Sequence, residues 1–151
     1  MKSIFFDLDG TLSDPKVGIT KSIQYALERL DVPVPTTKKL LWCIGPPLRA
    51  SFEHLLDEAR ADKAVALYRE RFGDVGLFEN DLYDGIPATL DALQNSGIRL
   101  FVATSKPHFY ADVSLNILEL LSILSGSSDR KWMARGPTSR VFWPTRSLKP
   151  A

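Results

Sequence analysis

The amino-acid sequence predicts an α/β fold in which a parallel β-sheet is interrupted by an inserted bundle of helices. Three observations support this prediction: an apolar run over residues 4–6 that ends in Asp7 and Asp9, helical periodicity through residues 14–79, and a second apolar run over residues 98–103. Both apolar runs are short and rich in β-branched and aromatic residues, which is typical of strands buried in a parallel sheet. The helical stretch lies between them, so we expect one sheet with an all-helical insertion.

Length and composition indicate a globular protein without strong net charge. At 151 residues, with 44% hydrophobic residues and a mean hydropathy of −0.07, the chain is long enough to bury one core. Its net charge of +1 argues against a nucleic-acid partner, because nucleic-acid-binding domains are basic overall.

No apolar stretch approaches the about 18 residues that cross a membrane, and the N-terminus is too acidic for a signal peptide. The single cysteine, Cys43, cannot form an internal disulfide, so we expect a cytoplasmic protein with no membrane partner.

The first strand ends in two carboxylates, Asp7 and Asp9. Side chains alternate along a strand, so these two point the same way unless the backbone bends, and they stand at the edge where α/β sheets bind ligands. Two like charges this close repel each other unless a cation or a shared proton lies between them. Magnesium, which prefers carboxylate oxygens and keeps water ligands that a phosphate can replace, is the simplest partner. The alternative is structural: one aspartate caps a helix and the other occupies a turn before Gly10.

Helical periodicity follows the first strand. Apolar residues recur at helical spacing in four segments, residues 19–30, 36–42, 48–56 and 64–72. A Val-Pro-Val-Pro sequence ends the first segment, because proline cannot continue a helix and biases the preceding residue to extended geometry. Helices with one apolar face bury those faces against one another, so residues 14–79 should form a small bundle.

The connection before the third helix contains a candidate substrate contact. Gly45-Pro46-Pro47 makes this connection rigid, and Arg49 follows at the start of the next helix, where a cation can meet a substrate anion. The alternative is that the prolines only stiffen the connection and that the arginine is solvated.

A second strand is predicted after a crossover helix. Pro87 is suited to the first turn of this helix, and Gly97 is suited to the left-handed position that ends it. The strand over residues 98–103 then leads into the sequence Thr-Ser-Lys. A helix between two strands is typical of a parallel crossover, which brings the carboxyl ends of both strands to one edge of the sheet. We therefore expect the Thr-Ser-Lys sequence to lie near Asp7.

The residues after the second strand suit the binding of a phosphoryl group. Hydroxyl groups such as those of Thr104 and Ser105, together with main-chain N–H groups, can hold phosphoryl oxygens while a carboxylate attacks phosphorus. A cation such as Lys106 can offset negative charge in the transition state. Alternatively, the Thr-Ser pair is the N-cap of the helix that begins at Pro107.

Two segments of the sequence resemble motifs of a known family. FFDLDGTL, which contains Asp7 and Asp9, is similar to motif I of the haloacid dehalogenase-like (HAD) phosphohydrolases, and VATSKP is similar to motif II. The resemblance implies a Rossmannoid parallel-sheet core with an inserted α-helical cap. On this basis we expect residues 1–13 and 80–122 to form the first half of the core, and residues 14–79 to form the cap that closes over the substrate.

The resemblance also implies an activity and a site. The expected activity is Mg²⁺-dependent hydrolysis of a small phosphorylated metabolite, of the phosphoglycolate-phosphatase kind, through an aspartyl-phosphate. Asp7 is the expected nucleophile and Asp9 the general acid and base, and the Asp7 carboxylate with the Asp9 main-chain carbonyl is expected to hold Mg²⁺. The remaining expected contacts are the phosphate-binding residues Gly10, Thr104, Ser105 and Lys106, and the cap residue Arg49 for the substrate.

The resemblance ends near residue 121. Residues 123–151 carry six basic residues and one acidic residue, Asp129, and neither helical nor strand periodicity can be followed through their last part. The family's motif III lysine and motif IV acidic pair are expected in this region, yet no acidic residue follows Asp129. Our hypothesis is that this atypical basic tail is truncated, disordered or out-of-frame sequence. The alternative is a basic aromatic segment that binds nucleic acid or an anionic surface.

The tail also sets two expectations for function. Loss of motifs III and IV should impair the phosphatase activity of this chain. The alternative is a catalytically inactive member of the family that binds phosphate or metal weakly.

Overall fold

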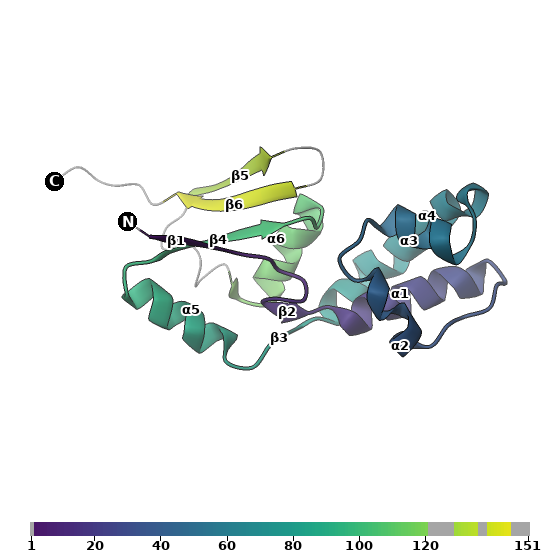
Figure 1. Cartoon of the computed structure of the whole chain (residues 1–151), viewed down its shortest axis with the longest axis horizontal. Coiled ribbons are helices and arrows are strands. Elements are labelled where there is room, and N and C mark those ends of the chain that lie inside the picture. Colours follow the sequence, from purple (N-terminus) through teal and green to yellow (C-terminus); the bar gives the residue numbers. More distant parts are fainter. Residues whose placement is uncertain (1, 121–128, 136–138, 146–151) are drawn as a thin grey trace. The chain divides into compact units, whose positions relative to one another are not determined.

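The two apolar runs of the sequence form a parallel strand pair in the computed structural model, which describes residues 2–120, 129–135 and 139–145. Strand β1 (Ser3–Phe6) pairs with β4 (Arg99–Thr104), with Ser3 opposite Arg99 and Phe6 opposite Val102. Helix α5 (Ile86–Asn95) precedes β4 (Figure 1). The predicted α/β fold, both strands and the crossover helix are confirmed.

Backbone contacts divide the chain into two units. The core unit contains Met1–Ser13 and Asp81–Ala151, and the helical unit is the continuous segment Asp14–Asn80. Two short strands, β2 (Ser13–Asp14) and β3 (Asp81–Leu82), form a separate two-stranded sheet where the chain leaves and re-enters the core unit. The helical unit is therefore an insertion after the first strand of the core.

The ends of α5 follow the proline and glycine signals of the sequence. Pro87 lies in the first turn, where its missing N–H leaves no helical hydrogen bond unmade. Gly97 has a φ of +74°, which L-residues with a side chain rarely adopt, and its N–H donates to the Gln94 carbonyl at 2.8 Å. This turn returns the chain directly into β4.

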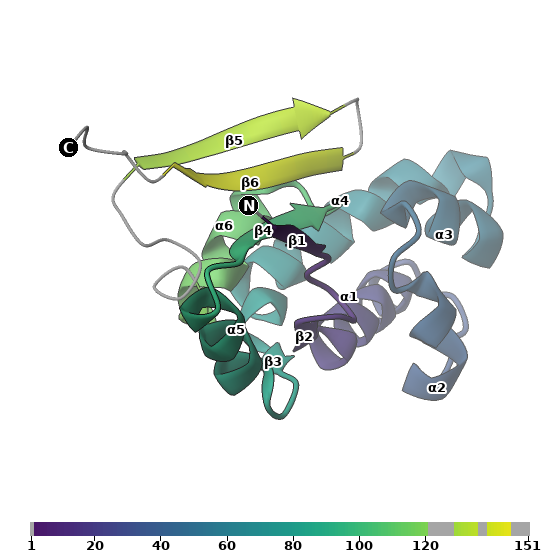
Figure 2. The same ribbon diagram turned by 60° about the vertical axis from the view of Figure 1, so that its left-hand side comes forward.

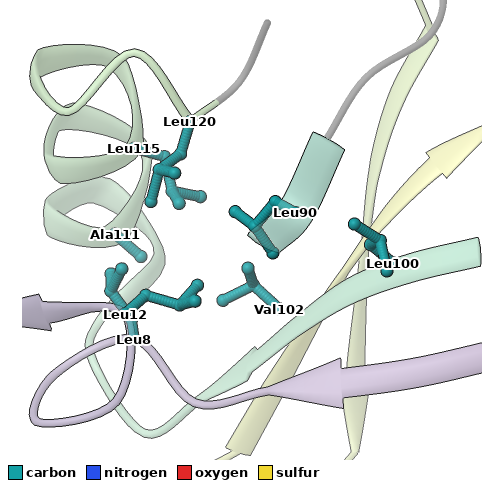
Figure 3. Packing of buried hydrophobic residues seen from close by; sticks show 8 residues of the cluster. All are labelled: Leu8, Leu12, Leu90, Leu100, Val102, Ala111, Leu115 and Leu120. Carbon is teal, nitrogen blue, oxygen red and sulfur yellow. The ribbon is translucent and has the colours of Figure 1, made fainter. Parts of the chain in front are cut away.

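One face of the sheet carries the hydrophobic core. Alternate residues of β1 and β4 lie on this face, and both α5 and α6 (His108–Ile117) pack against it. Figure 3 shows eight buried members of the cluster: Leu8, Leu12, Leu90, Leu100, Val102, Ala111, Leu115 and Leu120. Leu8 and Leu12 follow β1, so this core also holds the chain where it leaves the first strand.

The opposite face of the parallel pair is less covered. Phe5 of β1 and Phe101 of β4 stack there with ring centroids 4.9 Å apart. Phe101 is 2% exposed, whereas Phe5 is 55% exposed. The prediction that the first strand is buried is therefore wrong for its outer face. The physical reason is its position: β1 lies at the edge of the sheet, whose order is β1-β4-β6-β5.

The tail contributes two strands, β5 (Asp129–Arg135) and β6 (Ser139–Thr145). They pair antiparallel with each other, and β6 continues the sheet antiparallel to β4, with Val102 opposite Phe142 (Figure 2). The prediction that no strand can be followed through the last part of the tail is wrong for β6. Main-chain pairing to β4 does not require alternating side chains, and the Val-Phe-Trp sequence of β6 favours strands. Residues 121–128, 136–138 and 146–151 lie outside the described residues, so the expectation of disorder is untested there.

The helical unit contains the four predicted helices: α1 (Lys16–Arg29), α2 (Thr37–Leu40) followed by the 3₁₀ turn η1 (Leu41–Cys43), α3 (Leu48–Leu55), and α4 (Glu58–Asp74) followed by the 3₁₀ turn η2 (Gly76–Phe78). Helix α4 begins earlier than its apolar periodicity predicts, because the Asp57 side chain accepts the Arg60 N–H and caps the first turn. No helix within the described ranges is long and apolar enough to cross a bilayer.

Aromatic contacts and an ion pair of Arg71 with Glu79 are among the interactions that stabilise the helical unit. Tyr68 lies between Phe72, at a centroid distance of 5.1 Å, and Phe52, at 6.4 Å. Arg71 of α4 donates to Glu79 at 2.9 Å, and both side chains are about four-fifths covered, at 17% and 21% exposure. This hydrogen bond holds the pKa of the Glu79 carboxyl below its usual value.

Candidate active site

A tight turn follows β1 and presents the two motif aspartates. The Leu8 carbonyl accepts the N–H groups of Leu12 and Ser13 at 3.0 and 3.1 Å, and Leu8 and Leu12 are fully buried. Gly10 adopts a φ of +82°, which allows the chain to reverse there. The Asp-Leu-Asp-Gly-Thr-Leu sequence therefore anchors its leucines in the core and leaves its aspartates outside it.

Asp7 is the exposed carboxylate of the turn. Its Oδ1 accepts the Leu8 N–H at 2.8 Å, which orients the side chain relative to the main chain. The backbone bends immediately after β1, so Asp7 and Asp9 do not simply continue the strand alternation. Asp7 thus offers an oriented, accessible oxygen at the carboxyl end of β1.

Asp9 is held by a lysine that follows the other strand of the parallel pair. Lys106 Nζ lies 3.0 Å from Asp9 Oδ1 and 3.1 Å from Asp9 Oδ2. The Lys106 side chain is 6% exposed and the Asp9 side chain 19% exposed, so water screens this ion pair weakly. The two residues are 97 positions apart, and the contact confirms that the carboxyl ends of β1 and β4 meet at one edge of the sheet.

Thr104 and Ser105 lie at the same edge, where β4 ends. Thr104 is buried, and its Oγ1 accepts the Lys106 N–H at 3.2 Å, so its own hydroxyl proton can be donated elsewhere. Ser105 is exposed. The alternative that this pair caps the next helix is wrong, because the N-cap of α6 is Pro107 and it has no side-chain cap bond.

The two other expected contacts, Gly10 and Arg49, already have partners within the protein. The Gly10 N–H donates to the Ser13 carbonyl at 2.8 Å, so it is used within the turn, and phosphate binding by Gly10 stays a prediction. Arg49 lies on α3 of the helical unit, where it pairs with Glu53 and with Asp62 Oδ1 at 2.9 Å. Its charge is therefore matched within its own unit.

The oxygen groups of the turn partly fit a magnesium ion. The Asp7 carboxylate and the Asp9 main-chain carbonyl are hard oxygen ligands, and Mg²⁺ commonly takes one or two carboxylates with waters and a substrate phosphate. Among the residues that the structure describes, no group of three or more acidic, histidine or cysteine side chains gathers as a metal site. These residues alone therefore provide an incomplete set of ligands.

Two features of the site were missed by reasoning from the sequence. The anchoring role of Leu8 and Leu12 was accessible in principle, because they alternate with polar residues in the motif. No local sequence pattern indicates that Asp9 pairs with Lys106, because the residues between them include the whole helical unit. The parallel pairing of β1 and β4 brings these two distant residues together.

Comparison with known proteins agrees with the motifs. The family model for haloacid dehalogenase-like hydrolases matches residues 4–135. A 5'-nucleotidase of Pseudomonas aeruginosa is 53% identical over 111 residues, which make up 72% of this chain and 50% of that protein. A phosphoglycolate phosphatase of Aquifex aeolicus is 31% identical over 129 residues, 85% of this chain and 59% of that protein.

Solved structures show the same likeness. The crystal structure of a predicted phosphatase from Clostridium acetobutylicum superposes with a TM-score of 0.75 at 42% sequence identity, over 81% of this chain and 57% of that chain. The present chain thus spans about half the length of the curated relatives it matches. Since the family match extends over most of the sequence and includes both motifs, the chain belongs to the haloacid dehalogenase-like hydrolase family.

Proposed function

We propose that this protein hydrolyses small phosphate monoesters through an aspartyl-phosphate on Asp7. The observation that carries the proposal is the edge of the sheet, where an accessible Asp7 lies on the same turn as Asp9 and Thr104 ends the neighbouring strand. The printed names of two relatives, a 5'-nucleotidase and a phosphoglycolate phosphatase, support a phosphate monoester as substrate. Nucleoside monophosphates and phosphoglycolate are therefore the first substrates to test.

The first half-reaction transfers the phosphoryl group to the protein. An Asp7 carboxylate oxygen attacks phosphorus in line, the bond from phosphorus to the ester oxygen breaks, and Asp9 gives its proton to the departing oxygen. The Thr104 and Ser105 hydroxyls donate to the phosphoryl oxygens, where negative charge has to be held. The leaving alcohol then departs.

The second half-reaction releases phosphate. Asp9, now a carboxylate, takes a proton from water, and the water oxygen attacks phosphorus. The bond from phosphorus to the Asp7 oxygen breaks, which regenerates the Asp7 carboxylate and frees inorganic phosphate. Asp9 is again protonated and ready for the next ester.

Magnesium is the cofactor in this proposal. The Asp7 carboxylate and the Asp9 main-chain carbonyl would hold it, with waters and the substrate filling the other positions. When bound, Mg²⁺ reduces the repulsion between the Asp7 carboxylate and the anionic phosphoryl group. The part of the chain that the structure describes gathers no group of three or more acidic, histidine or cysteine side chains, so the Asp7 and Asp9 groups by themselves should bind the metal weakly.

We assign the helical segment the role of a cap over the substrate, with residues 14–79 as the cap and residues 1–13 and 80–122 as the core. A cap excludes bulk water and selects the leaving group. Arg49 would contribute to selection only by exchanging Glu53 or Asp62 for a substrate anion. The cytoplasmic setting remains a proposal that rests on the single cysteine.

The test is the hydrolysis of 4-nitrophenyl phosphate with and without Mg²⁺. We expect Mg²⁺-dependent release of nitrophenolate by the wild-type chain, and a loss of at least about a hundredfold in Asp7→Asn, which lacks the nucleophile. The matched control is Asp91→Asn, an exposed aspartate on α5, which should keep wild-type activity. Equal activity in the wild type and Asp7→Asn would remove Asp7 from the reaction.

A second candidate function is weak binding of phosphate or metal without catalysis. It is favoured by one observation: in the described residues 2–120, 129–135 and 139–145, no group of three or more acidic, histidine or cysteine side chains gathers as a metal site. Calorimetric titration with Mg²⁺ separates the candidates, because metal-supported turnover requires binding in the millimolar range or tighter. Binding without turnover would favour the second candidate.

A further inference from the structure

The buried pair of Lys106 and Asp9 has a geometry that restricts what the lysine can do. The ammonium nitrogen is at hydrogen-bond distance from both carboxylate oxygens, 3.0 and 3.1 Å, rather than from one. Charge-assisted hydrogen bonds are stronger than neutral ones, and contacts to both oxygens of one carboxylate restrict the rotation of its plane. The Asp9 carboxylate is therefore held in one orientation.

The lysine itself comes from a well-fixed segment of main chain. Its N–H donates to Thr104 Oγ1 at 3.2 Å, and Pro107 follows it with a φ of −52°. The side chain is 6% exposed, so its long stem is packed along its length. A packed stem and a fixed backbone give the ammonium group a defined position, as a positioning residue requires.

The same geometry limits a role for Lys106 in holding phosphate. The ammonium group uses one or two of its three protons on the two Asp9 oxygens, and the Lys106 side chain is only 6% exposed to an incoming phosphate. Moving the ammonium group to a phosphate would break its hydrogen bonds to Asp9 in a mostly covered site.

We propose that Lys106 is a positioning residue for Asp9: it orients the side chain of Asp9, the acid and base of the reaction, toward the ester oxygen. Lys106 is then not a main ligand of the phosphoryl group. This inference rests on the proposed phosphatase function. Loss of Lys106 should therefore lower activity most for esters whose leaving group needs a proton from Asp9. This difference between esters separates the two roles, because loss of a phosphate ligand would lower activity toward every ester to a similar extent.

A pair of esters with different leaving groups tests the inference in the full chain. Glycerol 2-phosphate has an alkoxide leaving group that needs a proton, whereas 4-nitrophenolate departs readily without one. We measure kcat/KM, which covers the steps up to the phosphoenzyme, in Lys106→Met, Lys106→Arg and Asp9→Asn. The matched control is Lys2→Met, an exposed lysine that precedes β1, at the end of this strand away from the site.

The expected result is an unequal loss. In Lys106→Met, kcat/KM should fall on the order of a hundredfold or more for glycerol 2-phosphate but less than about tenfold for 4-nitrophenyl phosphate, as in Asp9→Asn. Lys106→Arg should retain more activity toward the alkyl ester, and inorganic phosphate should inhibit all variants equally. Equal losses for both esters, with weaker inhibition by phosphate, would overturn the inference while leaving the proposed function intact. A wild-type chain that hydrolyses neither ester would overturn both.

A second measurement does not depend on turnover or on the folding of a Lys106 variant. In the wild-type protein, the ¹H–¹⁵N NMR spectrum of the lysine ammonium groups should contain a slowly exchanging Lys106 signal. This signal should disappear in Asp9→Asn and should not shift on addition of inorganic phosphate. A Lys106 signal that survives in Asp9→Asn, or that moves with phosphate, would refute the positioning role.

Discussion

Replacing Gly18 by alanine should destabilise the helical unit, although alanine is the better helix former. Gly18 lies in α1, where helix propensity alone predicts a gain of about 1 kcal/mol for alanine. A Cβ at this position would lie 2.0 Å from the Gly76 carbonyl oxygen and 3.2 Å from the Glu79 carbonyl oxygen. Both obstacles are main-chain atoms, which cannot rotate away as a side chain can.

The magnitude follows from the movement that the methyl group requires. Restoring an ordinary contact needs a shift of about 1 Å between α1 and η2, and overpacking of this kind costs about 1–3 kcal/mol. The shift also weakens the hydrogen bond from the Gly18 N–H to the Glu79 carbonyl, now 3.2 Å long, which contributes about 1 kcal/mol. After the propensity gain is subtracted, the free energy of unfolding should fall by about 1–3 kcal/mol.

Urea unfolding followed by far-UV circular dichroism measures this change. Gly18→Ala should lower the midpoint on the order of 1 M without changing the slope. The matched control is Gly73→Ala, because Gly73 also lies in a helix of this unit, α4, but a Cβ there meets no atom within 4 Å. That variant should be as stable as the wild type or more stable, by up to about 1 kcal/mol. A Gly18→Ala variant as stable as Gly73→Ala would refute the close approach of α1 to Gly76.

Three further perturbations test other parts of the structure. Leu12→Ala should lower the free energy of unfolding by about 2–5 kcal/mol, measured in urea, because this fully buried side chain leaves a cavity in the core; a loss below about 1 kcal/mol would contradict its burial. Asp57→Ala should cost about 0.5–2 kcal/mol in the same assay because it removes the cap of α4, whereas Thr36→Ala, at an N-cap without a side-chain bond, should cost less. Because Arg71 lowers the pKa of Glu79 in the folded state, the stability that this carboxylate contributes is present above about pH 4.5 and is lost as the pH falls through the folded pKa. The difference in thermal stability between the wild type and Glu79→Gln should therefore shrink below pH 4.5, and a constant difference across this range would exclude the pairing.

Local patterns were sufficient for most of the helices and for the parallel strands. The boundaries of α5 follow from Pro87 and Gly97, because each residue type has a backbone preference that acts without help from the rest of the chain. Apolar periodicity did not predict the early start of α4, because the residue that caps it is polar. Asp57 is nevertheless a residue type that predicts the start of a helix. Side-chain chemistry at helix ends thus predicts boundaries that apolar spacing misses.

The two strands of the tail show where local patterns fail. Residues 129–135 and 139–145 show no clear alternation, yet their main chains pair with each other, and β6 also pairs with β4. Pairing of main-chain groups satisfies hydrogen bonds whatever the side chains are, so it depends on an available neighbour rather than on sequence period. The exposed outer face of Phe5 has the same origin, because burial of a strand depends on which elements lie beside it.

The sequence by itself determined the family and the identity of the proposed nucleophile. An apolar strand that ends in Asp-Leu-Asp-Gly-Thr-Leu is a local feature, since the strand, the turn at Gly10 and the alternation of aspartate and leucine all depend on neighbouring residues. Only the tertiary structure decided that Lys106 holds Asp9. The parallel register of β1 and β4 brings together residues 97 positions apart, and burial makes their ion pair strong because little water screens it.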